Sequence, residues 1–372
     1  MKNLLLFILF FSVFIRAAES QTTVTDSMMS GGIMRHYHVY LPTNYASGSS
    51  RPLIIYLHGY SSNATTEQIY TNFMAVADTA GFLVVYPEGT VDSHGYQFWN
   101  AGIPGLPGVP DDVAFLSSLI DKLHNEYNIN LNRVYSTGLS NGGYMCYRLA
   151  WKLSDRIAAI ASVSGSMPPL DFAICLPPRP IPIMEIHGTA DTIVSYTGSV
   201  IATDIDTLMR FWVLHDRCLP ISDPIMLPHI DTADHTTVTH FEWVPELRNM
   251  SVELYRINGG THVDWPGSPY LTTDNMDFSA SSTIWQFFNR FELSSANVKA
   301  DKTADSFNFY PNPTPGIIHI TGSGVAMIFD MTGRKLLTST EKDIDLTSFP
   351  AGLYLLQLEN NGTRSVQKLM KY

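Results

Sequence analysis

Short runs of branched apolar residues alternate with helical patterns along most of this chain, and this alternation restricts the possible folds more than any other feature. Six runs are apolar enough to be strands buried on both faces: 53–57, 82–86, 133–137, 157–163, 183–186 and 252–257. Apolar residues recur at helical spacing in 69–77, 113–123, 144–153, 205–213 and 284–291. Strands buried on both faces are typical of parallel sheets. The alternation therefore predicts one α/β domain with a mostly parallel sheet and helices on both faces.

The composition allows a large buried core and excludes several classes of partner. The 372 residues are 45% apolar and 15% charged, which excludes global disorder. The net charge of −11 repels phosphate backbones and anionic lipid, so nucleic acid and membrane surfaces are not expected as partners. Neutral or apolar substrates are compatible with this charge.

The first 20 residues have the pattern of a signal peptide. Lys2 precedes an apolar stretch that runs, with one serine, over residues 4–15, and small or polar residues follow it. Spanning a bilayer takes roughly twenty residues, so this stretch is too short for a membrane helix, and we expect no membrane span in the mature chain. We therefore expect a secreted protein whose mature chain begins near residue 21.

Export permits disulfides, and the chain has three cysteines, Cys146, Cys175 and Cys218. An odd number allows at most one intramolecular pair. Cys146 falls in a helical pattern and is interpreted as a small core residue. We favour a disulfide between Cys175 and Cys218, while cysteine spacing alone leaves the connectivity open.

The character of the sequence changes after residue 293. Residues 294–306 are small, polar and charged, and we interpret them as a linker. Residues 307–372 contain short alternating stretches separated by prolines and glycines, which predicts a small all-β, sandwich-like domain. The α/β domain is expected over residues 21–293.

A serine between two glycines is the first candidate for chemistry. Gly138-Leu139-Ser140-Asn141-Gly142 lies between the predicted strand 133–137 and the predicted helix 144–153. This is the context of a sharp turn that exposes a serine hydroxyl above a sheet. The glycines are needed because the turn packs tightly against neighbouring elements. Ser140 is therefore the predicted nucleophile.

A serine hydroxyl needs a base to take its proton, and the base needs a carboxylate to orient it. Asp191 follows the predicted strand 183–186 and His262 follows 252–257, in the chain order serine, acid, histidine. Both lie just past the carboxyl end of a strand, where open parallel sheets place their sites. Taken singly, Asp191 is equally a turn carboxylate and His262 a loop imidazole. Their joint position and order favour a catalytic triad.

Two backbone N–H groups are predicted to form an oxyanion hole. Asn141 begins a helix, where the dipole also favours negative charge. Tyr60 comes after the predicted strand 53–57, in the segment His58-Gly59-Tyr60. His58 and His187 each precede a glycine after a strand, and we expect both to be structural rather than catalytic.

Other conspicuous residues have weaker interpretations. Trp99 and Trp265 are expected either to line the substrate cleft or to pack in the core. Asp111 and Asp112 open a helix and are expected to cap its N–H groups. The remaining histidines lack the ligand set of a known metal motif, so no metal site is expected at His36, His38, His229, His235 and His240.

These motifs together resemble those of secreted α/β-hydrolases grouped as polyhydroxybutyrate depolymerases, feruloyl esterases and acetylxylan esterases (carbohydrate esterase family one). The resemblance covers residues from about 33 to 292. Its motifs are Leu57-His58-Gly59, Asp111-Asp112-Val113, residues 138–143, His187-Gly188-Thr189 with Asp191, and residues 260–267. It implies an α/β-hydrolase fold, with Ser140 as nucleophile, Asp191 as acid and His262 as base.

Residues 307–372 resemble the C-terminal sorting domain of type IX secretion. The matching segments are Tyr310-Pro311-Asn312-Pro313-Thr314, Asp330-Met331-Thr332-Gly333 and Ala351-Gly352-Leu353-Tyr354. The resemblance implies export by the type IX secretion machinery to the cell surface or the extracellular space.

The sequence as a whole predicts a secreted serine esterase that works through an acyl-enzyme and needs no cofactor. We expect a polymeric ester substrate and favour feruloyl or acetyl esters of plant polysaccharide, with polyhydroxybutyrate as the alternative. A peptidase of the same fold and a non-catalytic, surface-displayed binding protein also stay open.

Overall fold

The computed structural model describes most of the chain. The described residues are 22–218, 224–245, 250–262, 265–270, 275–293, 307–330, 334–360 and 363–372. The predicted signal peptide (1–20) and the predicted linker (294–306) lie outside these residues. None of the helices within the described ranges has the length and hydropathy of a membrane-spanning segment.

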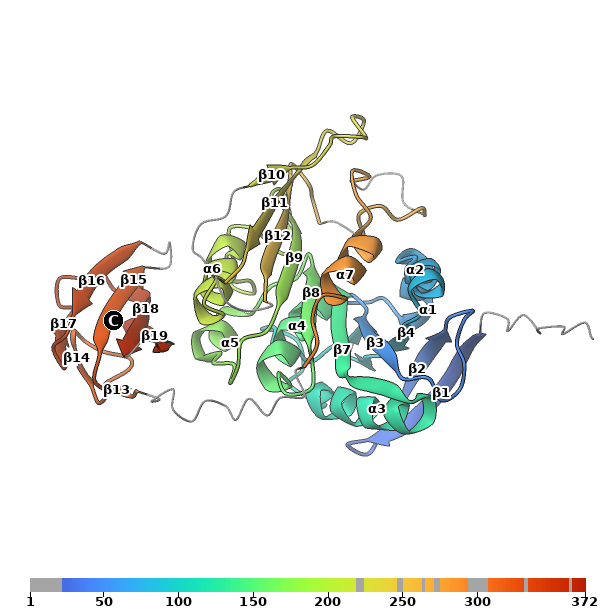
Figure 1. Ribbon diagram of the computed structural model, residues 1–372, viewed down its shortest axis with the longest axis horizontal. Helices are drawn as coiled ribbons and strands as arrows, with labels where there is room; N and C mark the ends of the chain where they lie inside the picture. The colour runs from blue at the N-terminus through green and yellow to red at the C-terminus, as the bar shows by residue number, and fades with distance from the viewer. Residues whose placement is uncertain are drawn as a thin grey trace, which may run out of the picture.

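A ten-stranded sheet forms the centre of the larger domain, with strand order β1-β2-β4-β3-β7-β8-β9-β12-β11-β10 (Figure 1). The six strands from β4 to β12 in this order pair in parallel, and the pairings at both edges are antiparallel. A small hairpin, β5 and β6, stands apart from this sheet. The strands are β1 Thr22–Ser30, β2 Ile33–Leu41, β3 Arg51–Leu57, β4 Leu83–Pro87, β5 Thr90–Val91, β6 Gln97–Phe98, β7 Ile129–Leu139, β8 Ala159–Val163, β9 Ile183–Gly188, β10 Ile225–Met226, β11 Thr237–Trp243 and β12 Val252–Asn258.

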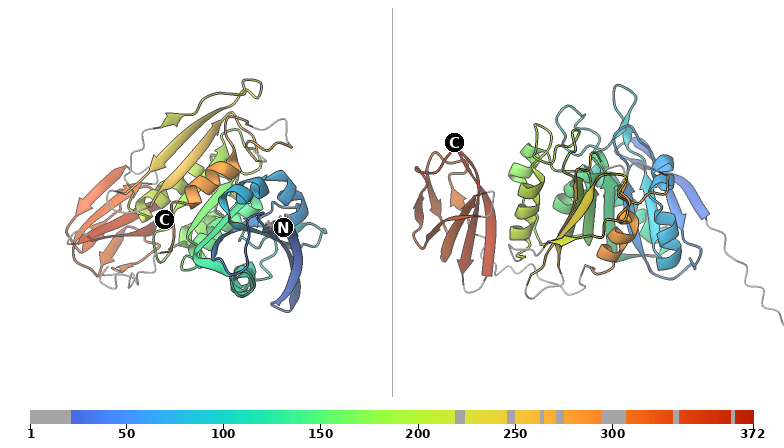
Figure 2. Two further views of the ribbon diagram at one scale, coloured as in Figure 1. Left: turned by 45° about the vertical axis from the view of Figure 1, so that its right-hand side comes forward. Right: turned by 90° about the horizontal axis from the view of Figure 1, so that it is seen from above.

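Helices cover both faces of this sheet, as Figures 1 and 2 show. Alternate residues of β3 divide between two apolar clusters: Leu53 and Ile55 pack with the cluster of α3, α4, α5 and α6, and Ile54 packs with that of α1, α2 and α7. This is the two-residue period of a strand buried on both sides. The helices are α1 Ala64–Tyr70, α2 Phe73–Ala80, α3 Asp112–Tyr127, α4 Asn141–Lys152, α5 Pro169–Ile174, α6 Ile205–His215 and α7 Ala280–Phe288.

The predicted α/β architecture is confirmed. All six predicted strands overlap the parallel strands β3, β4, β7, β8, β9 and β12. The antiparallel strands β1, β2 and β11 escaped prediction because partly exposed strands do not form continuous apolar runs; in β1 every side chain is exposed or only partly buried. The helix expected over 69–77 is two helices, because Asn72 takes a left-handed conformation (φ 55°) between α1 and α2.

The C-terminal residues form a small all-β domain, coloured red in Figure 1. Its two antiparallel sheets have the orders β13-β14-β17 and β16-β15-β18-β19. They share one apolar core that includes Ile318, Ile328 and Leu356, which confirms the all-β prediction. The strands are β13 Phe309–Tyr310, β14 Ile317–Ile320, β15 Val325–Asp330, β16 Lys335–Ser339, β17 Asp343–Asp345, β18 Gly352–Asn360 and β19 Thr363–Lys371.

The expected disulfide between Cys175 and Cys218 is not formed. Both cysteines are buried free thiols, and so is Cys146. Cys175 follows α5 and Cys218 follows α6, and each packs into the apolar cluster on that face of the sheet. Burial raises the pKa of each of these two thiols to about 12. The two cysteines therefore act as small core side chains, as was expected only of Cys146.

A buried ion pair joins strand β2 to the start of α3. Nη1 of Arg35 lies 2.7 Å from Oδ1 of Asp112, and both side chains are at most 2% exposed. The guanidinium also lies over the ring of Phe115, 4.0 Å from its centroid. The cap of α3 is Asp111, whose carboxylate accepts the Ala114 N–H at 3.0 Å. Of the two aspartates expected to cap this helix, Asp111 does so and Asp112 is an ion-pair partner.

We expect the substitution Arg35→Ala to lower the free energy of unfolding by about 3–5 kcal/mol, because it leaves the Asp112 carboxylate buried without its cation. The matched control is Glu126→Gln, which breaks the partly exposed pair of Lys122 and Glu126 on α3 and is expected to cost less than about 1 kcal/mol. Urea unfolding followed by tryptophan fluorescence measures both, since all six tryptophans lie before residue 294. Equal losses in the two variants would contradict this assignment.

Candidate active site

Ser140 sits on a strained turn between β7 and α4. Its backbone has φ 52° and ψ −114°, a region that non-glycine residues rarely occupy and that costs about 1–3 kcal/mol. The neighbouring structure holds the turn in place: the Ser140 N–H donates to Val163 O at 2.8 Å, and its carbonyl accepts the Tyr144 N–H at 3.0 Å. The side chain is partly exposed at the carboxyl edge of the sheet.

The glycines of the motif are required by close backbone packing. A Cβ atom at Gly138 or at Gly142 would collide with the carbonyl oxygen of Leu57, at the end of β3. Gly59 lies close to the serine, since a Cβ atom there would lie 3.8 Å from that of Ser140. The tight packing that was predicted to require these glycines is therefore present in the structure.

Asp191 and His262 are in contact at the same edge. They follow β9 and β12, which pair in parallel, and their loops are joined by a hydrogen bond from the Ala190 N–H to Gly260 O at 2.8 Å. His262 Nδ1 lies 2.7 Å from Asp191 Oδ2. The Asp191 side chain is buried, and that of His262 is 17% exposed. The geometry is that of a base oriented by a carboxylate.

Within the described residues, Ser140 Oγ makes no hydrogen bond to His262. Such contacts are often long in free enzymes and shorten when substrate is bound. The structure therefore brings together two of the three predicted triad members and places the third at the same sheet edge.

Asp191 is held in its ionised form. Its Oδ1 accepts the N–H groups of Ile193 at 2.8 Å and Val194 at 2.9 Å. Burial alone would raise the pKa of Asp191, but hydrogen bonds with His187 and His262 outweigh burial and hold the pKa well below the usual range. The carboxylate is therefore charged at neutral and mildly acidic pH.

The two residues predicted to supply oxyanion donors, Asn141 and Tyr60, come directly after Ser140 and Gly59 in the chain. Asn141 is the first residue of α4, and the first N–H groups of a helix have no partner within it. Its side chain is clamped to Trp99, accepting the Trp99 N–H at 2.6 Å and donating to Trp99 O at 3.1 Å. Tyr60 follows Gly59; the adjacent N–H groups of Ser61 and Ser62 donate to other carbonyls.

His58 is a neutral imidazole that anchors this turn. Its Nδ1–H donates to Gly59 O at 2.7 Å, and its Nε2 accepts the Gly89 N–H at 2.9 Å. The two contacts leave no place for a second ring proton. Burial, together with the nearby charge of Arg35, lowers the pKa of His58 to about 4. These contacts are consistent with the structural role expected of His58.

Trp99 and Trp265 pack in the core rather than forming exposed walls of a cleft. Both side chains are at most 1% exposed. The Trp99 indole N–H donates to His58 O at 3.1 Å, and that of Trp265 donates to Ser281 Oγ at 2.9 Å. The cleft-lining role expected for them is corrected, because buried indole rings with satisfied N–H groups offer no surface to a substrate.

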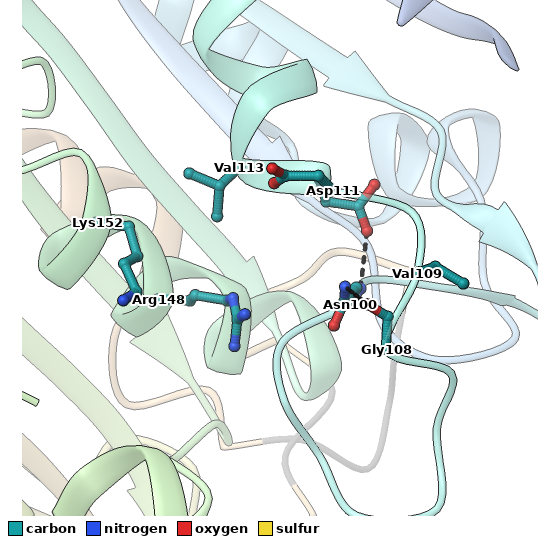
Figure 3. Close-up of a pocket in the computed structure, with 8 residues that line it drawn as sticks. Asn100, Gly108, Val109, Asp111, Val113, Arg148 and Lys152 are labelled. Carbon is teal, nitrogen blue, oxygen red and sulfur yellow. Dashed lines mark hydrogen bonds between the residues drawn. The ribbon is translucent and has the colours of Figure 1, made fainter. Parts of the chain in front are cut away.

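A cavity of about 480 Å³ lies between α4 and the segment that leads into α3 (Figure 3). Arg148 and Lys152 project from α4 on one side, and Asn100 and Val109 lie on the other. None of the predicted triad residues lines it, so it is distinct from the site around Ser140. The described residues contain no group of histidine, cysteine and carboxylate side chains arranged to hold a metal ion.

The sequence interpretation missed one group of buried residues near Asp191. Glu185 and Tyr147 are fully buried and hydrogen-bonded to each other, and Glu185 also contacts His187. The sequence contains a signal for this group, because Glu185 is a carboxylate within the apolar run 183–186. A charged side chain in a strand that is buried on both faces needs a partner.

A mostly parallel sheet with helices on both faces and a strained serine turn after a central strand define an α/β-hydrolase. The fold is similar to that of the acetyl xylan esterase from Aspergillus awamori, with a TM-score of 0.50 and 13% sequence identity, over 73% of this chain and 99% of that one. At this identity the likeness concerns the fold alone.

Residues 35–172 match the family described as esterase PHB depolymerase, and residues 308–372 match the secretion system C-terminal sorting domain. Residues 35–172 therefore resemble the esterase PHB depolymerases among the α/β-hydrolases, and residues 308–372 resemble a secretion sorting domain. Both resemblances inferred from the motifs are confirmed.

Two curated relatives extend the comparison. The bifunctional acetylxylan esterase/xylanase of Neocallimastix patriciarum is 37% identical over 262 residues, which are 70% of this chain and 35% of that protein. Feruloyl esterase B of Piromyces equi is 29% identical over 164 residues, 44% of this chain and 30% of that protein. The chain thus spans about a third of the length of each.

The anchoring role of His58 predicts a pH-dependent stability. The folded protein holds His58 neutral down to about pH 4, whereas the unfolded chain binds a proton below about pH 6.5. The contribution of His58 is therefore fully present above pH 6.5 and is lost as the pH falls towards 4, by up to about 3 kcal/mol. We expect His58→Asn to reduce this loss.

Urea unfolding at pH 7 and at pH 4.5, followed by tryptophan fluorescence, measures the effect. His94→Asn is the control, since the His94 side chain is 76% exposed and its replacement is expected to leave the pH dependence unchanged. An identical decrease of stability with pH in wild type and His58→Asn would refute the neutral, buried state.

Proposed function

We propose that this protein is a serine carboxylic-ester hydrolase with Ser140, His262 and Asp191 as its triad. The observation that carries the proposal is the 2.7 Å contact between His262 Nδ1 and Asp191 Oδ2 at the sheet edge where Ser140 stands on its strained turn. The match of residues 35–172 to the family described as esterase PHB depolymerase, and the similarity to two relatives named as esterases, support it.

In the proposed mechanism, Ser140 Oγ attacks the ester carbonyl while His262 Nε2 takes the hydroxyl proton. The carbonyl oxygen becomes an oxyanion, which accepts hydrogen bonds from the Tyr60 and Asn141 N–H groups. Collapse of the tetrahedral intermediate breaks the bond to the leaving alcohol, which receives the proton from His262. Water, deprotonated by His262, then attacks the acyl-enzyme and releases the acid. Asp191 stays ionised and stabilises the imidazolium in both steps.

We propose feruloyl or acetyl esters of plant polysaccharide as substrates. The named activities of the two relatives, acetylxylan esterase and feruloyl esterase, support this choice. The family description favours polyhydroxybutyrate as the second candidate. Hydrolysis rates on acetylated xylan, ethyl ferulate and polyhydroxybutyrate film, measured side by side, separate the three.

We further propose that residues 308–372 direct export by the type IX secretion machinery, so that the enzyme acts at the cell surface or outside the cell. The sorting-domain match supports this location, and a polymeric ester would be met there. Loss of the enzyme from the surface and medium when these residues are deleted is the expected result.

The substitution Ser140→Ala is expected to reduce kcat on 4-nitrophenyl acetate by at least about 1,000-fold, because triad members act as a unit. The melting temperature is expected to stay close to that of the wild type, since only a partly exposed hydroxyl is removed. Ser118→Ala, on the exposed surface of α3, is the control and should keep full activity. Near-normal turnover by Ser140→Ala would remove Ser140 from the mechanism.

A further inference from the structure

A second imidazole lies against the carboxylate of Asp191. Nε2 of His187 is 3.4 Å from Asp191 Oδ2, the same oxygen that contacts His262, and is 2.8 Å from the Val194 carbonyl oxygen. On its other side, Nδ1 of His187 lies 2.9 Å from Glu185 Oε1. The side chains of His187, Glu185 and Asp191 are all buried.

Both ring nitrogens of His187 face oxygen atoms that only accept, unless Glu185 is itself protonated. A nitrogen lone pair pointed at such an oxygen is repelled, so each of these contacts requires a proton. His58 provides the contrast, because its Nε2 faces a backbone N–H and must be unprotonated. The two histidines share the same strand–histidine–glycine pattern but have opposite surroundings.

The surroundings of His187 favour the charged form. The titratable groups near it are Glu185 on β9, Asp191 in the loop after β9, and the ring of Tyr196, whose centroid is 5.9 Å away. On the neighbouring strand β12, the charged residue in register with His187 is Arg256, whose guanidinium lies over the ring of Phe241. Glu185 is in turn held by the Tyr147 hydroxyl of α4, which donates to its Oε2 at 2.8 Å. Burial opposes protonation, but hydrogen bonds to Asp191 and Glu185 outweigh it and raise the pKa of His187 to about 9.

We propose that His187, kept protonated by Glu185, is a positioning residue that acts on the reaction through Asp191. This inference rests on the proposed function. The imidazolium contacts the same carboxylate oxygen as His262 and places a positive charge next to it. That charge partly offsets the field of Asp191, so the resting base is less readily blocked by a proton in mildly acidic solution.

The test uses the full-length enzyme and the pH profile of kcat/KM on 4-nitrophenyl acetate. Glu185→Gln keeps the size of the side chain and allows its amide to donate to His187 Nδ1, so the contact of His187 with Asp191 is retained while the charge is lost. We expect plateau activity within about threefold of the wild type, and the acidic limb displaced to higher pH by about half a unit or more.

Asp216→Asn is the matched control. Asp216 is a buried carboxylate, 2.6 Å from His215 Nδ1, and it accepts the Ile181 N–H close to the opposite end of β9. Removing its charge is expected to lower the melting temperature without moving the acidic limb. His187→Gln is the second charge-removing variant and replaces Glu185→Gln if that protein does not fold; the same displacement is expected.

The outcomes separate this inference from the proposed function. A wild type without activity on any ester would defeat the proposed function. A second outcome is that the wild type is active and shows the same acidic limb in its pH profile as the folded charge-removing variant. That result would overturn the role of His187. A displacement of equal size in Asp216→Asn would overturn it as well, because the shift would then follow from any lost buried charge.

Discussion

The close approach of the β7–α4 turn to the end of β3 determines the position of the rest of the site. Backbone packs directly on backbone there, because Gly138 and Gly142 carry no Cβ atom that would meet Leu57 O. The same contact brings Gly59 beside Ser140, and the predicted oxyanion donors Tyr60 and Asn141 come directly after these two residues in the chain. The positive φ at Ser140 persists because the hydrogen bonds of this turn hold it.

The second organising element is a buried carboxylate between two imidazoles. Asp191 makes contacts with both His187 and His262 through one oxygen, and its other oxygen accepts two backbone N–H groups. The two strand-end histidines illustrate how surroundings determine charge. His58 is neutral because it meets a donor at Gly89, whereas His187 meets only oxygen atoms. His58 anchors the predicted oxyanion turn, and His187 contacts Asp191, the predicted acid.

The features that could be predicted from the sequence are those that depend on local pattern and on chain order. The parallel strands were identifiable because continuous branched apolar runs mark strands buried on both faces. Asp191 and His262 were identifiable as a pair because both follow strands that end at one edge. The turn at Asn72, the burial of Trp99 and the contact of Glu185 with His187 depend on packing between distant segments, which neither spacing nor composition encodes. The unformed disulfide has the same cause, since Cys175 and Cys218 each find a place in the apolar core.

The most direct test of the site is a crystal structure of the enzyme inactivated by a small fluorophosphonate. We predict a covalent bond from phosphorus to Ser140 Oγ, the phosphoryl oxygen about 3 Å from the Tyr60 and Asn141 nitrogens, and the His262 imidazole turned towards the modified serine. Modification of a different residue, or of none in a preparation that hydrolyses esters, would contradict the assignment of Ser140, His262 and Asp191 as the catalytic triad.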